Sequence, residues 1–172
     1  MTPRRLAEVR WHARAGQGAK TAAHALALAL LERGKSVQAF PEYGPERRGA
    51  PLRAYTRLSD RPIRRHDGVT EPDLVVVLEP TLVREVDVAE GLREDGLVLV
   101  SGETVPPGLE RVAVRCVPAA RDANLVMLGA AAAALGEPPL EAVQDAAAQV
   151  LGRKLGEDRV RAAVAEGYAC LA

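Results

Sequence analysis

The fold is decided by residues 8–40, EVRWHARAGQGAKTAAHALALALLERGKSVQAF. Apolar and polar side chains alternate from Glu8 to His12, which predicts a strand with one buried face. A glycine turn follows, and the Ala- and Leu-rich stretch 19–33 ends at Gly34, a common helix stop. Residues 36–40 predict a second short strand. The order strand, glycine turn, helix, strand predicts a βαβ unit with parallel strands and a right-handed crossover.

The rest of the chain supplies further strands and then a helical tail. Residues 74–78, LVVVL, form a continuous apolar run, which is typical of a central parallel strand covered on both faces. Alternation over residues 52–59 predicts a strand with one solvated face, and Asp87 is a candidate N-cap for a short helix through Arg93. Two more strands are expected at residues 97–100 and 112–117, and three helices at residues 122–135, 139–152 and 156–171. The chain is therefore predicted to be a single α/β domain over residues 1–172: an open, mostly parallel sheet with flanking helices and a helical C-terminal tail.

The composition fits a folded domain with balanced charge. The 172 residues include 23 basic and 23 acidic side chains, and 48% are hydrophobic, which rules out a long charged tail and argues against disorder. The two halves differ, because residues 1–66 hold 14 bases and 5 acids while residues 67–172 hold 9 bases and 18 acids. This asymmetry predicts a polarised molecule. Only 3% of the residues are aromatic, so stacking platforms for single-stranded nucleic acid are not expected.

The cysteine content and the pattern of apolar residues indicate the cellular compartment of the protein. Cys116 and Cys170 are too few for the four thiolates of an iron–sulfur cluster and give no disulfide framework. Neither a secretory signal nor a run of about 18 uncharged apolar residues is found, so a cytoplasmic location is expected. Low contents of Asn, Cys and Met suit a heat-adapted protein, although the excess of Arg over Lys can equally reflect genome composition.

The glycine turn is the first candidate binding site. Gly16 and Gly18 permit close backbone approach at a helix start, where the amides and the helix dipole favour anions. The stretch fails the P-loop pattern, because Ala19 precedes Lys20 and no glycine lies at the first position of that motif. It also fails the dinucleotide pattern G-x-G-x-x-G, whose third glycine is replaced by Thr21. The turn is thus either an anion or nucleotide site or a purely structural turn that packs the helix on the strand.

The loop at residues 43–49, YGPERRG, is the second candidate. Two adjacent arginines between glycines suit bidentate recognition of carboxylate or phosphate, although a solvated charge run is the plainer interpretation. In a parallel sheet this loop leaves the same edge as the glycine turn, where open α/β sheets bind ligands. The candidate binding residues are Gly16, Gln17, Gly18, Tyr43, Gly44, Glu46, Arg47, Arg48 and Gly49.

No catalytic or metal-ligating residue is predicted. His12, His24 and His66 lack the spacing of metal ligands, and the sequence around Ser101 is not a nucleophile elbow. Cys116 is expected to be an inert buried thiol. A self-sufficient enzyme is therefore not expected.

Five segments spread over nearly the whole chain carry a more specific signal. They are EVRWHARAGQGAKTAA at 8–23, GKSVQAFPEYGPERRGAP at 34–51, RLSDRPI at 57–63, PDLVVVLEPTL at 72–82 and ANLVMLGA at 123–130. Together they resemble the gamma subunit, or gamma domain, of 2-oxoacid:ferredoxin oxidoreductases of the pyruvate/ketoisovalerate type. Two positions depart from the family pattern: Ala15, where many relatives have Gly, and Glu79, where Asp is usual.

The resemblance implies a role in CoA-dependent oxidative decarboxylation of pyruvate or another 2-oxoacid, with electrons passed to ferredoxin. In that family thiamine diphosphate and Mg²⁺ lie between the alpha and beta subunits, and the iron–sulfur clusters lie in the beta and delta components. This chain would hold none of these cofactors alone, would be inactive alone and would work with alpha, beta and delta partners, with CoA as cosubstrate. No nucleic acid or membrane partner is expected, and the isolated chain would be free to form a homo-oligomer. The glycine turn and the Arg47-Arg48 loop are expected to lie on a positive sheet edge that orders the subunit interface or the CoA phosphates.

Two other interpretations stay open beside this one. The chain could be an independent nucleotide- or CoA-binding module, or an interaction scaffold whose glycine turn is purely structural. Pyruvate, 2-oxoisovalerate, 2-oxoglutarate and indolepyruvate enzymes share the domain, and general likeness favours pyruvate or branched-chain substrates.

Overall fold

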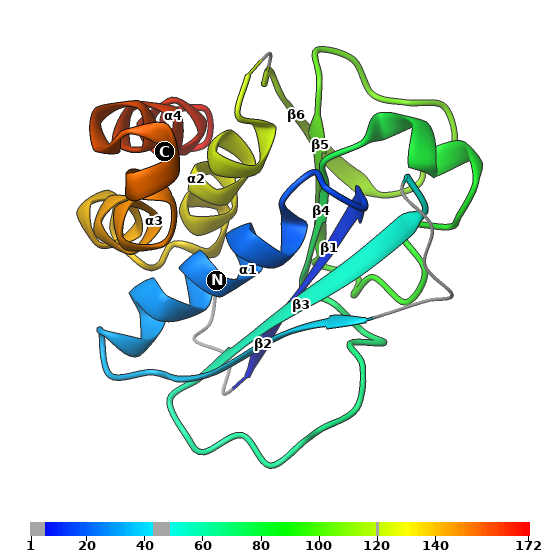
Figure 1. Cartoon of the computed structure of the whole chain (residues 1–172). Helices are drawn as coiled ribbons and strands as arrows, with labels where there is room; N and C mark the ends of the chain where they lie inside the picture. The colour runs from blue at the N-terminus through cyan, green and yellow to red at the C-terminus, as the bar shows by residue number, and fades with distance from the viewer. Residues whose placement is uncertain (1–5, 43–48, 120) are drawn as a thin grey trace.

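Six strands form one sheet across the part of the chain that the computed structural model describes, residues 6–42, 49–119 and 121–172 (Figure 1). β1, β4, β5 and β6 are parallel neighbours, whereas β3 is antiparallel to both β1 and β2. Five of the six described strands therefore point the same way, which confirms the predicted open, mostly parallel sheet. The strands are β1 (Ala7–Arg14), β2 (Ser36–Glu42), β3 (Pro51–Ser59), β4 (Leu74–Val77), β5 (Leu97–Ser101) and β6 (Ala113–Val117), in the sheet order β2-β3-β1-β4-β5-β6.

The βαβ unit expected at residues 8–40 is present in a split form. β1 and β2 run in the same direction and are joined by α1 (Ala19–Leu31), but β3 lies between them. Ala54 and Leu58 of β3 belong to the same buried core as Val9 and Trp11 of β1. The parallel direction predicted for β1 and β2 is confirmed, and β3 separates them because it carries the small and apolar residues that fit beneath α1 beside β1.

The helices cover one face of the sheet. In Figure 1, α1, α2 (Ala123–Leu135), α3 (Leu140–Leu155) and α4 (Glu157–Ala169) all lie on the same side of the strands, and the predicted helical tail is confirmed. α2 and α4 pack in unusually close contact, since a Cβ atom at Gly167 would lie 1.7 Å from the carbonyl oxygen of Val126. None of the helices in the described ranges is long and apolar enough to cross a bilayer.

The opposite face is covered by irregular segments and the short 3₁₀ helix η1 (Pro80–Arg84). Leu82, Val88 and Leu109 from these segments pack on alternate residues of β4 and β5 in a second buried cluster. The helix expected from Asp87 to Arg93 was wrong, because these residues form turns and Asp87 Oδ1 accepts from the Ala89 backbone N–H at 3.0 Å. Gly91 has φ +70° and lies so close to Thr70 that a Cβ would be 2.0 Å from its carbonyl oxygen, which is incompatible with a regular helix there.

Candidate functional site

The topological switch point of the sheet lies between β1 and β4. From β1 the chain crosses one face through α1 to β2, whereas from β4 it crosses the other face through η1 to β5. Ligands of open α/β sheets bind at the carboxyl ends of strands where connections leave on opposite faces. Two segments meet at this place: residues 14–18 at the end of β1 and residues 79–81 after β4. We call these residues the switch point.

The glycine turn has a conformation that depends on its glycines. Gly16 and Gly18 have φ values of +95° and +85°, in the left-handed region that side chains disfavour. A Cβ on Gly18 would also lie 2.7 Å from Asn124 Nδ2, so α2 approaches the turn closely. Gly18 is the N-cap of α1, and no side chain caps this helix. The positive end of the α1 dipole is therefore directed at the switch point.

Four residues of the switch point form a closed ring of hydrogen bonds, which we call the switch-point ring. The Arg14 backbone N–H donates to Gln17 Oε1 at 2.7 Å, and Gln17 Nε2 donates to Glu79 Oε2 at 2.9 Å. Thr81 Oγ1 donates to Glu79 Oε1 at 2.7 Å and accepts from Arg14 Nη2 at 3.1 Å. The ring ties the glycine turn to the first residues of η1. The hydrogen bonds from Thr81 and Gln17 lower the pKa of Glu79 and keep its carboxylate ionised at neutral pH.

Arg14 also connects the switch point to the loop after β2. Its Nη1 donates to the carbonyl oxygen of Gly49 at 3.1 Å. The backbone N–H of Ala15 donates to the carbonyl oxygen of Ala50 at 3.1 Å. The prediction that this loop reaches the same sheet edge as the glycine turn is therefore confirmed at Gly49. Its other candidate residues, Tyr43, Gly44, Glu46, Arg47 and Arg48, lie outside the described residues.

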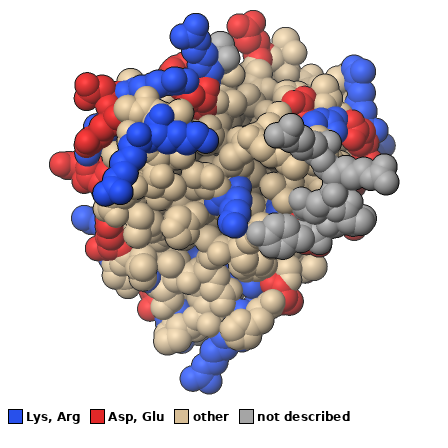
Figure 2. Space-filling model, in the orientation of Figure 1, with Lys and Arg blue, Asp and Glu red and all other residues tan. Residues whose placement is uncertain are grey.

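The positive sheet edge that the sequence asymmetry predicts stays a prediction, because its Arg47 and Arg48 lie outside the described residues. Arg14 is paired with Glu85 at 2.5 Å, and the hydrogen bond that Arg14 donates to Glu85 raises the pKa of Arg14. Lys35, another base of the first half, is paired with Glu137 at 2.8 Å. Basic and acidic side chains lie next to one another around the rim of the face shown in Figure 2. Arg14 and Lys35 of the basic half are thus paired with acids of the second half.

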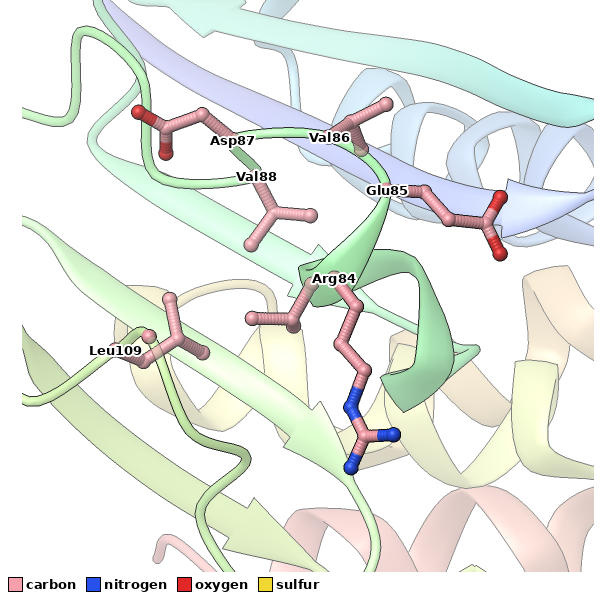
Figure 3. A pocket seen from close by; sticks show the side chains of 8 residues that line it. Arg84, Glu85, Val86, Asp87, Val88 and Leu109 are labelled. Atoms are coloured by element: carbon pink, nitrogen blue, oxygen red, sulfur yellow. The ribbon is translucent and has the colours of Figure 1, made fainter.

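A shallow hollow of about 340 Å³ lies beside the end of η1. It is lined by residues 83–88 and by Gly108 and Leu109. Figure 3 shows Val88 and Leu109 on its two sides, while the Glu85 side chain points away from it. The Glu85 carboxylate instead pairs with Arg14.

The non-helical face of the sheet carries a buried polar layer. Glu8, Arg10 and His12 of β1 and Arg57 of β3 are all at most 3% exposed. The solvated polar face expected for these strands was wrong, because the segments 60–73 and 85–96 cover it. Among the described residues, every buried side-chain nitrogen and oxygen has a hydrogen-bond partner. The layer is therefore a satisfied network, as buried polar groups require.

Glu8 and Arg57 form the buried ion pair of this layer. Arg57 Nε donates to Glu8 Oε1 at 2.7 Å, and the two side chains are 0% and 1% exposed. Arg57 also donates to the carbonyl oxygen of Gly68 at 3.1 Å and lies 5.6 Å from the ring centroid of Phe40. The more exposed Arg65 and Arg93 lie 3.8 and 3.9 Å from Glu8 Oε2. Arg57 is thus the closest charge partner that Glu8 has in the described part of the chain.

Arg10 and His12 form the second half of the polar layer. Arg10 Nη2 donates to the carbonyl oxygens of Val88 and Glu90 at 3.0 and 2.5 Å, which fixes the covering segment to β1. Arg10 Nε donates to His12 Nε2 at 3.1 Å. Burial, reinforced by the charge of Arg10, lowers the pKa of His12 to about 3. His12 is therefore a neutral structural acceptor, not an acid–base group at neutral pH.

The free energy of unfolding is expected to fall as the pH decreases from 7 to 5, because folding keeps His12 unprotonated. An unfolded histidine titrates near pH 6.5, while His12 in the folded chain titrates near 3. Between these values the unfolded state binds the extra proton, so stability is lost at up to about 1.4 kcal/mol per pH unit. Urea unfolding at pH 7 and pH 5 measures this slope. His12→Gln should flatten it and the exposed-site control His24→Gln should retain it; an unchanged slope in His12→Gln would contradict the assignment.

The described residues were compared with the requirements of a metal site and with the burial expected for Cys116. No group of three or more His, Cys, Asp or Glu side chains that could hold a metal ion occurs among them. Cys116 is partly exposed on the edge strand β6, so its expected burial was wrong. An edge strand has a neighbour on one side only, which leaves its side chains less covered.

The sequence matches the family model of pyruvate ferredoxin/flavodoxin oxidoreductase over residues 8–170. The chain belongs to this family. It is 44% identical over 171 residues to the pyruvate/ketoisovalerate oxidoreductases common subunit gamma of Thermococcus kodakarensis, covering 91% of this chain and 92% of that one. Pyruvate synthase subunit PorC of Thermotoga maritima is 43% identical over 178 residues, covering 94% and 92%.

Solved structures of the family show the same architecture. The pyruvate oxidoreductase subunit PORC of Thermotoga maritima has a TM-score of 0.82 and 37% identity, covering 96% of this chain and 97% of that chain. A 2-oxoglutarate:ferredoxin oxidoreductase from Magnetococcus marinus has a TM-score of 0.65 and 16% identity, covering 97% of this chain and 30% of that chain, and shows the fold alone. The family membership confirms the resemblance carried by the five sequence segments. It gives no support to a stand-alone binding module or to a scaffold without a role in an oxidoreductase.

The switch point and its surroundings contain residues that the motifs predict and residues that they miss. Gly16, Gln17 and Gly18 lie in the switch point, and Gly49 contacts it through Arg14; their binding role stays a prediction. The motifs do not predict Arg14, Glu79, Thr81 and Glu85 as part of the same site. The signal for them is positional, since Arg14 ends β1 and the other three follow β4, and it becomes usable only once these two strands are known to be neighbours.

Proposed function

We propose that this gamma subunit of a pyruvate or 2-oxoacid:ferredoxin oxidoreductase places its switch point against the phosphates of CoA in the assembled complex. The observation that carries the proposal is that the glycine turn and the start of α1 lie at the topological switch point, where Arg14 Nη1 also contacts Gly49. A helix start with glycines is suited to anions through its backbone amides and its dipole. Arg47 and Arg48, close to Gly49 in sequence, would add guanidinium groups suited to phosphate.

The nature of the relatives supports CoA as the ligand. The Thermococcus kodakarensis relative is named as a subunit common to pyruvate and ketoisovalerate oxidoreductases. A subunit shared by two enzymes with different 2-oxoacids is poorly placed to select the 2-oxoacid. It is better suited to a component that both reactions use, and CoA is such a component.

The decarboxylation and electron-transfer chemistry belongs to partner subunits in this proposal. Alpha, beta and delta subunits would hold thiamine diphosphate, Mg²⁺ and the iron–sulfur clusters, and ferredoxin would accept the electrons from the complex. The described part of this chain offers no group of metal-ligating side chains, and the sequence has two cysteines. The chain would then be inactive alone and would contribute to CoA binding and to assembly.

Replacing Arg47 and Arg48 with alanine is expected to raise the KM for CoA by at least about tenfold in the assembled complex. Loss of one hydrogen bond to a charged group, about 1.5 kcal/mol, gives this factor. The KM for the 2-oxoacid should not change. Steady-state kinetics and the subunit stoichiometry of the purified complex are the two measurements, and Arg153→Ala, an exposed position on α3, is the matched control. If the KM for CoA and the stoichiometry both stay at wild-type values, the loop has neither role.

A further inference from the structure

Gln17 holds the two segments of the switch point together through one side chain. Its Oε1 accepts from the Arg14 backbone N–H at 2.7 Å, and its Nε2 donates to Glu79 Oε2 at 2.9 Å. Rotating the amide by half a turn would place a donor against the Arg14 N–H and an acceptor against the carboxylate. Both bonds therefore fix the side chain in one orientation.

Glu79 is fixed in the same way from η1. Its Oε1 accepts from Thr81 Oγ1 at 2.7 Å and from the Thr81 backbone N–H at 3.3 Å. Thr81 is in turn held by Arg14 Nη2 at 3.1 Å. The Glu79 carboxylate thus has one oxygen committed to η1 and the other to Gln17, so it transmits the position of η1 to the glycine turn.

The glycine turn needs such support because its backbone is intrinsically free. Gln17 is the residue between Gly16 and Gly18, both of which have positive φ values and no side chain. Glycine loses more conformational freedom on ordering than any other residue. The side-chain bonds of Gln17 supply the constraint that its neighbours cannot provide.

We propose that Gln17 and Glu79 are positioning residues that hold the glycine turn in its ligand-binding conformation, an inference that rests on the proposed function. Neither side chain is required to touch CoA. The pair sets the location of the backbone around Gly18 relative to η1, so the cost of ordering the turn is met before the ligand arrives. Releasing the turn should weaken CoA binding roughly tenfold, as expected when about one residue has to be ordered on binding.

Gln17→Glu is the sharpest test because it changes one amide to a carboxylate of the same size. The acceptor for the Arg14 N–H is kept, while two carboxylates now face each other across the contact with Glu79. In the assembled complex the KM for CoA should rise roughly tenfold, with kcat and the KM for the 2-oxoacid unchanged. The swap Gln17→Glu with Glu79→Gln restores a donor and an acceptor in reversed order at the wild-type net charge. It should bring the KM for CoA back to within about threefold of wild type.

The chain offers a matched control at the other end of α1. Gln149 Nε2 donates to Glu32 Oε1 at 3.0 Å, the same chemical pair at an exposed place, and Glu32 is the C-cap of α1. Gln149→Glu introduces the same change of charge and should leave every kinetic constant unchanged.

The outcomes separate this inference from the proposed function. Three results would overturn the positioning role. The KM for CoA could stay unchanged in Gln17→Glu, or the swap could fail to restore it. The third is that Gln17→Glu lowers kcat and changes the KM values for both CoA and the 2-oxoacid. If Arg47→Ala with Arg48→Ala still raises the KM for CoA in that case, the CoA site stands and only the positioning role fails. If neither set of variants moves the KM for CoA, the proposed function fails as well.

Discussion

Replacing Arg57 with methionine is expected to destabilise the folded chain by about 3–5 kcal/mol. The substitution keeps much of the apolar stem but leaves Glu8, 1% exposed, without the guanidinium that lies 2.7 Å from it. Arg65 and Arg93 lie 3.8 and 3.9 Å from the other carboxylate oxygen and are 46% and 37% exposed, so they cannot replace it. Urea unfolding of the isolated chain at pH 7 measures the free energy of unfolding, provided that the denaturant m-value is the same for all variants.

Two further variants show whether burial of the Glu8–Arg57 pair causes the large destabilisation expected for Arg57→Met. Lys35→Met removes a cation that binds Asp60 and Glu137 on a more exposed surface, so its cost should be about 1 kcal/mol or less. Arg57→Met combined with Glu8→Gln removes both charges and should recover part of the stability that Arg57→Met loses. If Arg57→Met costs no more than Lys35→Met, the buried pair contributes no more than a surface pair.

Gly167→Ala is expected to cost about 3 kcal/mol, at the upper end of the usual range for overpacking. The added methyl group would lie 1.7 Å from the carbonyl oxygen of Val126, and backbone cannot move aside as a flexible side chain can. α2 and α4 would have to separate along their contact. The midpoint of thermal or urea unfolding should fall accordingly.

Gly152→Ala is the matched control on the neighbouring helix α3. A Cβ there meets its nearest neighbours at 3.8 Å, an ordinary contact, so alanine should stabilise the helix by about 0.5–1 kcal/mol. The two glycine substitutions are therefore expected to have opposite signs. Equal effects would mean that the close approach of α2 and α4 is not what requires glycine at position 167.

The periodicity of the sequence predicts the elements better than it predicts their neighbours. The apolar run at residues 74–78 and the Ala-rich stretch at residues 19–33 are a strand and a helix, because burial and helix propensity are encoded locally. The insertion of β3 between β1 and β2 depends on which strand packs better beneath α1, and no local pattern contains that comparison. The helix predicted after Asp87 fails for a related reason: Gly91 is fixed by a contact with Thr70, which lies in another segment.

The same limit separates the predicted part of the site from the missed part. Gly16 and Gly18 are recognisable because their chemistry is carried by a short contiguous motif. Glu79 becomes significant only when β4 is known to lie beside β1, since its partner Gln17 is far away in sequence. The sequence does not predict that the polar layer is buried, because alternation shows which side chains share a face but not whether a covering segment buries that face.

The split strand order also constrains when the switch point forms during folding. β1 does not pair with β2, the strand that follows it; its partners are β3 and β4. Such distant pairings close long loops and form slowly compared with local helix contacts. The switch-point ring needs Glu79, the second residue after β4, so it can close only once the centre of the sheet is in place. A nascent or partly unfolded chain without β4 docked would therefore have the glycine motif but not the fixed turn, and the turn would be fixed only in chains whose sheet centre has formed.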